Sequence, residues 1–152
     1  MKTINTILGR TIKFEEFDTA KNWILYFPNE NWCLTIIADE KNKNHFDEII
    51  RKSIEKNVSY ICAVGKQHHV IHIMADDEIQ FREVDIENHY LPQHSIITIS
   101  DEDFENGLWS SIYLTQNPET EIKEIIILDL TKTAFEKTFD LIEKFNNGYL
   151  PK

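Results

Sequence analysis

The sequence predicts an α/β fold. We expect a three-layer sandwich, with helices on both faces of a mostly parallel sheet of four or five strands, of Rossmann-like or flavodoxin-like kind. Four short isoleucine-rich runs are apolar along almost their whole length, as expected for strands that are covered on both faces. These runs alternate with segments that carry apolar residues at helical spacing. A helix between successive strands is what a right-handed parallel connection requires.

The four predicted strands cover residues 32–38, 58–64, 95–100 and 124–129. β-branched residues dominate them, and such side chains suit a pleated sheet. Asn57 ends the helix that precedes the second strand, so the connection between the two is very short. A connection of this length returns the chain directly to the same sheet.

The segments between the predicted strands carry apolar residues at helical spacing. Before the second strand, an apolar stripe with a spacing of three to four residues predicts a helical face, with charged residues on the other side; the stripe consists of Phe46, Ile49, Ile50 and Ile54. The segment from 68 to 84 has a weaker stripe, and we predict that it is helical as well.

Two further helices are predicted after the third and fourth strands. Asp103 is placed to cap the first of them, within which Gly107 costs about 1 kcal/mol relative to alanine. In the last helix, Thr133 and Glu136 have capping-box spacing. Its expected inward stripe consists of Phe135, Phe139, Ile142 and Phe145.

The secondary structure of residues 1–31 is the hardest to predict from the sequence. The apolar run 23–27, which Pro28 ends, fits an added strand in a hairpin with the run that follows, or an apolar segment laid over the core. Apolar residues at positions 4, 7, 8 and 12 also fit a helical stripe, although Gly9 weakens it. We expect residues 1–152 to form one α/β domain.

The composition argues against a membrane or secreted protein. No apolar run approaches the ~20 residues that span a bilayer, and residues 1–14 lack the unbroken apolar stretch of a secretory signal. The two cysteines, Cys33 and Cys62, lie inside strand-like runs, where we expect small buried side chains; a disulfide depends on geometry that the sequence does not show. The prediction is a cytoplasmic location.

The negative charge is concentrated in one segment. Of the net charge of −10, residues 76–105 carry −9, with ten acidic residues and one basic residue. Such a field opposes binding to nucleic acid or to anionic membranes and favours a basic protein partner. A solvated face that only keeps the protein soluble is the alternative. The candidate partner-binding residues are Asp76, Asp77, Glu78, Asp101, Glu102, Asp103 and Glu105.

Polar residues follow each predicted strand. If the strands are parallel, their carboxyl ends meet at one edge of the sheet, where ligands bind in open α/β folds. The candidate ligand-binding residues at this edge are Asp39, Gly65, His68, Asp101 and Asp129. Acids at strand ends resemble the layout of bacterial receiver domains, but the number and order of the strands do not match that family.

Histidines give a weak candidate for a metal site. His68, His72 and Asp76 are spaced four residues apart, which places all three on one face of a helix. Solvated histidines on a polar helix face are the simpler interpretation. The chain has four glycines and no glycine-rich loop, so neither the dinucleotide fingerprint nor a P-loop is present, and we expect no cofactor.

Residues 32–146 resemble a small bacterial α/β family of unassigned function. The residues that carry the resemblance are Trp32, Asp39-Glu40, Arg51-Lys52, Asn57-Val58, Tyr60-Ile61-Cys62-Ala63 and Gly65. The resemblance implies the same α/β fold and brings no catalytic residues with it.

Three functional hypotheses follow. The first is a non-catalytic binding protein, similar in size and charge to immunity or antitoxin proteins, whose acidic segment engages a basic protein. The second is a small-ligand or hydrolase-type site at the strand ends. The third is self-association through an unprotected edge strand. We assign no catalytic residue, and catalysis is not what we expect.

Overall fold

The structure is a computed structural model that describes residues 1–40, 43–84 and 89–152, the side chains of residues 43 and 44 excepted. Within these residues, one sheet of six strands has the order β1-β2-β6-β3-β4-β5. The elements in chain order are β1 (Lys2–Ile7), β2 (Arg10–Glu16), β3 (Trp32–Ile37), α1 (Lys43–Glu55), β4 (Tyr60–Val64), α2 (His68–Val84), β5 (Ile97–Asp101), α3 (Phe104–Tyr113), β6 (Glu124–Asp129) and α4 (Phe135–Asn146).

The sheet is mixed. β1 pairs with β2 in the antiparallel sense, and the four other pairs of neighbouring strands are parallel. The four predicted strands are confirmed as β3, β4, β5 and β6, and they lie side by side and point the same way. The expected number of four or five strands was too low, because the N-terminal segment adds two.

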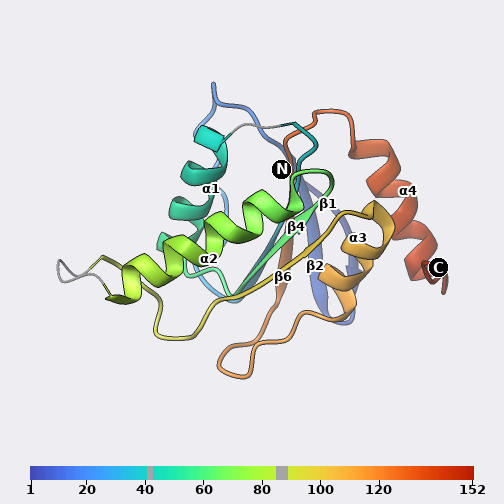
Figure 1. The fold of residues 1–152 in the computed structure, drawn as a ribbon. Coiled ribbons are helices and arrows are strands. Elements are labelled where there is room, and N and C mark those ends of the chain that lie inside the picture. Colours follow the sequence, from blue (N-terminus) through green and yellow to red (C-terminus); the bar gives the residue numbers. More distant parts are fainter. Residues whose placement is uncertain (41–42, 85–88) are drawn as a thin grey trace.

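Helices cover both faces of the sheet, as expected of three layers. Figure 1 shows α1 and α2 on one side of the strands and α3 and α4 on the other. The apolar side chains of alternate strand residues divide accordingly into two buried clusters, one beneath each helical layer. None of the described helices combines the length and the hydropathy that crossing a membrane requires.

The N-terminal segment forms the hairpin of β1 and β2, so the helical stripe expected there was wrong. Leu8 and Gly9 connect the two strands with positive φ angles of 54° and 74°. A two-residue turn with both φ angles positive matches the twist of the strands that it joins. The turn is hard to recognise from the sequence, because asparagine or glycine is usual at the first position and this chain has leucine there.

Residues 17–31 lie over the core instead of forming a strand. The rings of Phe17 and Trp23, of Trp23 and Phe27, and of Phe27 and Trp32 contact each other edge to face, with centroids 5.5, 5.4 and 5.6 Å apart. Trp23 and Phe27 are buried against the same cluster as α1 and α2. The alternative of an apolar segment laid over the core is therefore confirmed, and the strand at residues 23–27 was wrong.

Candidate functional site

The parallel strands bring the predicted ligand-binding residues to one edge of the sheet. Asp129 ends β6, Asp39 follows β3, Gly65 follows β4 and Asp101 ends β5. These four strands are neighbours in that order, so the four positions lie in a row along the carboxyl edge. Helix α2 begins at His68, shortly after the turn at Gly65.

Asp129 is fully buried, and its carboxylate is saturated by local donors. One oxygen accepts the Thr131 amide at 2.8 Å and the Thr131 hydroxyl at 2.6 Å, and the other accepts the Ala134 amide at 2.9 Å. These bonds fix the turn that leads into α4. Since a buried carboxylate is stabilised by such donors, the geometry assigns Asp129 a structural role.

The same bonds explain why the capping box expected at Thr133 and Glu136 was wrong. Helix α4 begins after Ala134, and no side chain caps it at that position. Asp129 accepts the free amide of Ala134 from across the turn instead. In the inward stripe, Ile142 and Phe145 are buried as expected, whereas Phe139 is 40% exposed.

The turn after β4 is held just as tightly. Gly65 has a φ of +106°, and a Cβ atom at this position would lie 2.7 Å from both the Ala38 carbonyl oxygen and Asp39 Oδ1. Only glycine fits a backbone that approaches its neighbours so closely. The same Asp39 oxygen accepts the Lys66 amide at 3.1 Å, so Asp39 joins the ends of β3 and β4.

The end of β5 leads into α3 through two aspartates. Asp101 Oδ1 accepts the Asp103 amide at 2.8 Å, and Asp103 Oδ2 accepts the Asn106 amide at 2.8 Å. The second bond is the helix cap predicted for Asp103. Both side chains remain open to solvent, since Asp101 is half-exposed and Asp103 is exposed.

The histidines do not converge on a metal. Among the described residues, no group of three His, Cys, Asp or Glu side chains is arranged to hold a metal ion. His72 contacts Asp76, with Nε2 3.3 Å from Oδ2, but His68 does not join them. His68 Nδ1 is buried without a hydrogen-bond partner in the described part of the chain.

Instead, His72 and Asp76 attach α2 to the edge strand. Ser100 Oγ lies 2.9 Å from His72 Nδ1, and the Thr98 hydroxyl donates to Asp76 Oδ1 at 2.6 Å. Although serine, histidine and aspartate meet here, the Asp76 side chain is 56% exposed. A catalytic triad places a buried acid behind its histidine, which this arrangement lacks.

The structure reduces the number of acidic side chains in this segment that are free to contact a partner. Glu78 forms an ion pair with Arg82 at 2.9 Å, in which the Arg82 side chain is only 5% exposed. The Tyr149 hydroxyl donates to Glu105. Asp85 and Glu87 lie outside the described residues. The exposed or half-exposed carboxylates that remain at β5 and on the adjacent part of α2, here called the acidic edge, are Asp76, Asp77, Asp101, Glu102 and Asp103.

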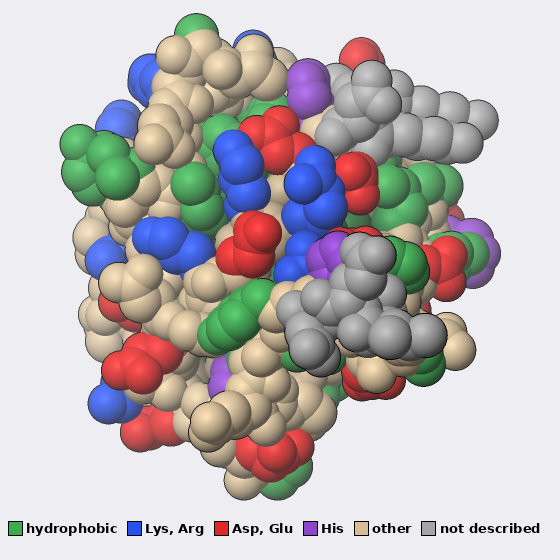
Figure 2. All heavy atoms as spheres, turned by 90° about the vertical axis from the view of Figure 1, so that its left-hand side faces the viewer, with side chains coloured by type: hydrophobic (Ala, Val, Ile, Leu, Met, Phe, Trp, Pro, Cys, Tyr) green, Lys and Arg blue, Asp and Glu red, His purple; other side chains and the backbone are tan. Residues whose placement is uncertain are grey.

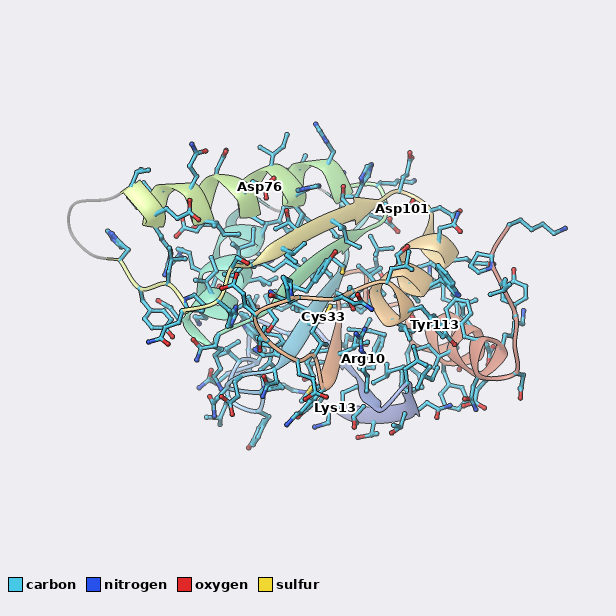
Figure 3. The ribbon with its side chains drawn as sticks, turned by 90° about the horizontal axis from the view of Figure 1, so that it is seen from below. Arg10, Lys13, Cys33, Asp76, Asp101 and Tyr113 are labelled. Atoms are coloured by element: carbon cyan, nitrogen blue, oxygen red, sulfur yellow. The ribbon has the colours of Figure 1, made fainter. Side chains whose placement is uncertain are left out.

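The acidic edge differs in its charge balance from the surface of α1. Figure 3 shows Asp76 on α2 and Asp101 at the end of β5, both along the outer side of the sheet. In Figure 2, which shows the side formed by α1, acidic and basic side chains alternate. There, Asp47 pairs with Arg51 at 3.0 Å and Glu48 with Lys52 at 2.7 Å. The unbalanced charge is thus a property of the β5 side.

Sequence reasoning did not place β5 at the edge of the sheet. β5 pairs with β4 and, among the described residues, with no other strand. All five of its residues are half-exposed, whereas β3 and β4 are buried throughout. The half-polar sequence Ile-Thr-Ile-Ser-Asp was the available signal, because a central strand of a parallel sheet is apolar along almost its whole length.

The second feature that sequence reasoning missed is a cavity between α3 and the edge strand. It has a volume of about 330 Å³, and its walls include Tyr60 and Cys62 of β4, Ile99 of β5, and Ser110 and Leu114 of α3 or its end. Burial raises the pKa of Tyr60 and holds the pKa of the Cys62 thiol well above 9.0. The cavity wall thus combines apolar side chains with polar groups, among which are the side chains of Ser110 and Asp101.

The cysteines are buried, as expected from the sequence. Cys33 is 0% and Cys62 is 1% exposed, and their sulfur atoms lie 3.7 Å apart on neighbouring strands. Both thiols are free.

A family model, "Domain of unknown function (DUF7684)", matches residues 11–146. The chain belongs to this family. The DUF7684 match begins within β2 and ends with α4, so it contains the five parallel strands, the acidic edge and the cavity beneath α3. The resemblance to a family of unassigned function, predicted from residues 32–146, is confirmed. No curated protein and no solved structure matches the chain.

Proposed function

We propose that this DUF7684 domain is a non-catalytic, cytoplasmic binding protein whose acidic edge engages a basic protein partner. The observation that supports the proposal is the position of the unneutralised carboxylates. Asp76, Asp101 and Glu102 lie along an open strand edge, whereas the acids on α1 are paired with bases. Exposed charges of one sign steer an oppositely charged partner and select against like-charged ones.

The carboxylates at the centre of the strand ends support a binding role over catalysis. Asp129 accepts three hydrogen bonds within its own turn, and Asp39 holds the amide of Lys66. A general acid or base needs a proton-transfer position that faces a substrate. Immunity and antitoxin proteins of similar size and charge offer an analogy for an acidic surface that covers a basic partner.

The proposal is tested with two variants of equal charge. The edge variant combines Asp76→Asn, Asp77→Asn, Asp101→Asn and Glu102→Gln. The control variant combines Glu55→Gln, Glu121→Gln, Glu136→Gln and Asp140→Asn, all at exposed positions on α1, before β6 and on α4. Each variant removes four negative charges, so overall charge is matched and only the position of the change differs.

Both variants are used to capture partners from the source cell, with wild type as reference. We expect basic proteins to bind wild type and the control variant, to be lost from the edge variant, and to dissociate as NaCl rises from about 50 to about 500 mM. Equal capture by the two variants would contradict the proposal, since position on the surface would then not matter.

A site for a small ligand at the strand ends is the second candidate. Two observations favour it: Asp39 is exposed beside the turn at Gly65, and His68 Nδ1 is buried without a partner among the described residues. A screen of metals and nucleotides by thermal shift tests this candidate, because a ligand at 100 times its Kd adds about 2.7 kcal/mol of stability. A screen without any shift would count against it.

The Rossmann-like fold type is part of the proposal. The order β5-β4-β3-β6 agrees with the first four positions of the strand order 3-2-1-4-5-6. The chain departs from that pattern at the next position, where β2 precedes the other four strands in sequence. The agreement supports a Rossmann-like arrangement of the four central strands with an N-terminal hairpin added at one side.

A further inference from the structure

β5 presents a row of unpaired backbone groups to the outside. The Ile97 amide donates to the Ser59 carbonyl, and the Asp101 carbonyl accepts the Gly65 amide, so both residues direct their backbone groups toward β4. Backbone direction alternates along a strand. The amides and carbonyls of Thr98 and Ser100 therefore point away from β4, to the side where the described part of the chain places no strand.

The two faces of this open edge differ in chemistry. The side chains of Thr98 and Ser100 contact Asp76 and His72 of α2, so the α2 face of the edge carries an exposed carboxylate. Ile97 and Ile99 face α3, and Ile99 forms a wall of the cavity of about 330 Å³. The face toward α2 is thus anionic, whereas the face toward α3 is apolar at Ile97 and Ile99 and has Asp101, another residue of the cavity wall, at its end.

We propose that β5 binds an extended segment of a basic partner as an added strand, with cationic residues of the segment toward α2 and apolar residues in the cavity beneath α3. The inference rests on the proposed function of the acidic edge and adds how the partner is held. In strand addition, backbone hydrogen bonds supply affinity and alternate side chains supply specificity. The partner segment therefore alternates Lys or Arg with apolar residues.

The charge of the edge disfavours a second copy of the chain as the occupant. Pairing β5 with β5 of another molecule would bring Asp76, Asp101 and Glu102 of both copies together. Like charges that face each other across an interface oppose association, whereas a cationic strand neutralises them. A basic segment is therefore the occupant that this edge favours.

The probe for the first experiment is a capped nine-residue peptide that alternates lysine and valine. Amide hydrogen exchange of the whole domain is followed by NMR without and with saturating peptide. We expect exchange of the Thr98 and Ser100 amides to slow by about tenfold or more, because they gain partners, while the Ile97 and Asp101 amides, already bonded within the sheet, stay protected.

The second experiment uses a matched pair of variants at one position. Ser100→Pro removes the outward amide, and Ser100→Ala keeps it, while both remove the hydroxyl that contacts His72. Proline is tolerated in an edge strand where its nitrogen faces outward. We expect Ser100→Pro to weaken peptide binding about tenfold and Ser100→Ala to bind nearly as wild type. Thermal melting confirms that both variants are folded.

A peptide in which serines replace the valines tests the cavity, and we expect it to bind about tenfold more weakly.

Peptide binding that protects neither Thr98 nor Ser100, or that Ser100→Pro does not weaken, would overturn strand addition but leave the acidic edge as a binding surface. Loss of discrimination between the edge and control variants would overturn the proposed function itself. A β5-mediated dimer in sedimentation experiments would assign the edge to self-association.

Discussion

Strands β3 and β4 are buried along their whole length, whereas every residue of β5, the edge strand beside β4 in the same sheet, is half-exposed. At the centre, polar groups are bonded or neutral: Asp129 accepts three hydrogen bonds, and burial keeps the Cys62 thiol protonated. At β5, carboxylates and backbone groups remain open to solvent. The difference indicates that the centre of the sheet serves stability and that its β5 edge is available for binding.

Aspartate to asparagine substitutions at the centre of the sheet and at its β5 edge separate these roles. We expect Asp129→Asn to lower the free energy of unfolding by about 3 kcal/mol, because its buried amide group meets donors where the carboxylate accepted them. Chemical denaturation measures the loss. A loss below about 1 kcal/mol would show that the turn before α4 does not depend on this carboxylate.

Gly107→Ala tests how closely α3 lies on the centre of the sheet. An added Cβ would lie 2.8 Å from a methyl carbon of Val64. Alanine favours a helix by about 1 kcal/mol over glycine, but we expect the overlap to outweigh this gain and destabilise the domain by about 1–2 kcal/mol. Combining it with Val64→Ala relieves the overlap, so the double variant should lose less than the sum of the single losses. Additive losses would contradict the packing argument.

The Cys62 thiol gives a pH-dependent test of the dry interior. Because burial raises its pKa in the folded state, the unfolded chain ionises first, near the ordinary value of 9.0. The stabilisation is fully present below this pH and falls above it, by up to about 1.4 kcal/mol per pH unit. We expect the stability difference between wild type and Cys62→Ala to shrink between pH 8 and pH 10 in urea denaturation. A constant difference would indicate that the thiol reaches solvent.

Asp101→Asn is the substitution for which we expect the smallest change in unfolding free energy. Its carboxylate accepts one amide, that of Asp103, and an asparagine carbonyl can accept the same bond. Because the side chain is also half-exposed, we expect a change in unfolding free energy below about 0.5 kcal/mol. A loss as large as that of Asp129→Asn would remove the distinction between the two regions.

Particular elements show where sequence patterns were sufficient. The runs that became β3, β4 and β6 were found because both of their faces are covered, which leaves a continuous apolar pattern. Asp103 was correctly assigned as a helix cap because capping depends on residues three positions apart. The cap of α4 failed for the opposite reason: its acceptor, Asp129, lies across a turn, where no local spacing indicates it.

The sequence predicted which acidic residues belong to the candidate site, but it did not predict which of them are engaged by other side chains. The concentration of acids in residues 76–105 was evident, but Glu78 and Glu105 are engaged by Arg82 and Tyr149, the second of which is distant in sequence. Nothing local marked the hairpin at Leu8 and Gly9, whose backbone angles are those usually given by asparagine and glycine.

By itself, the sequence determined the four strands and four helices that follow residue 31, and where negative charge accumulates. These properties depend on neighbours within a few residues along the chain. The tertiary structure decided that β5 is the edge strand, that Asp129 is enclosed while Asp101 is open, and that a cavity lies between α3 and β5. Such features depend on which strands pair and how closely helices approach them, and contacts between distant residues set both.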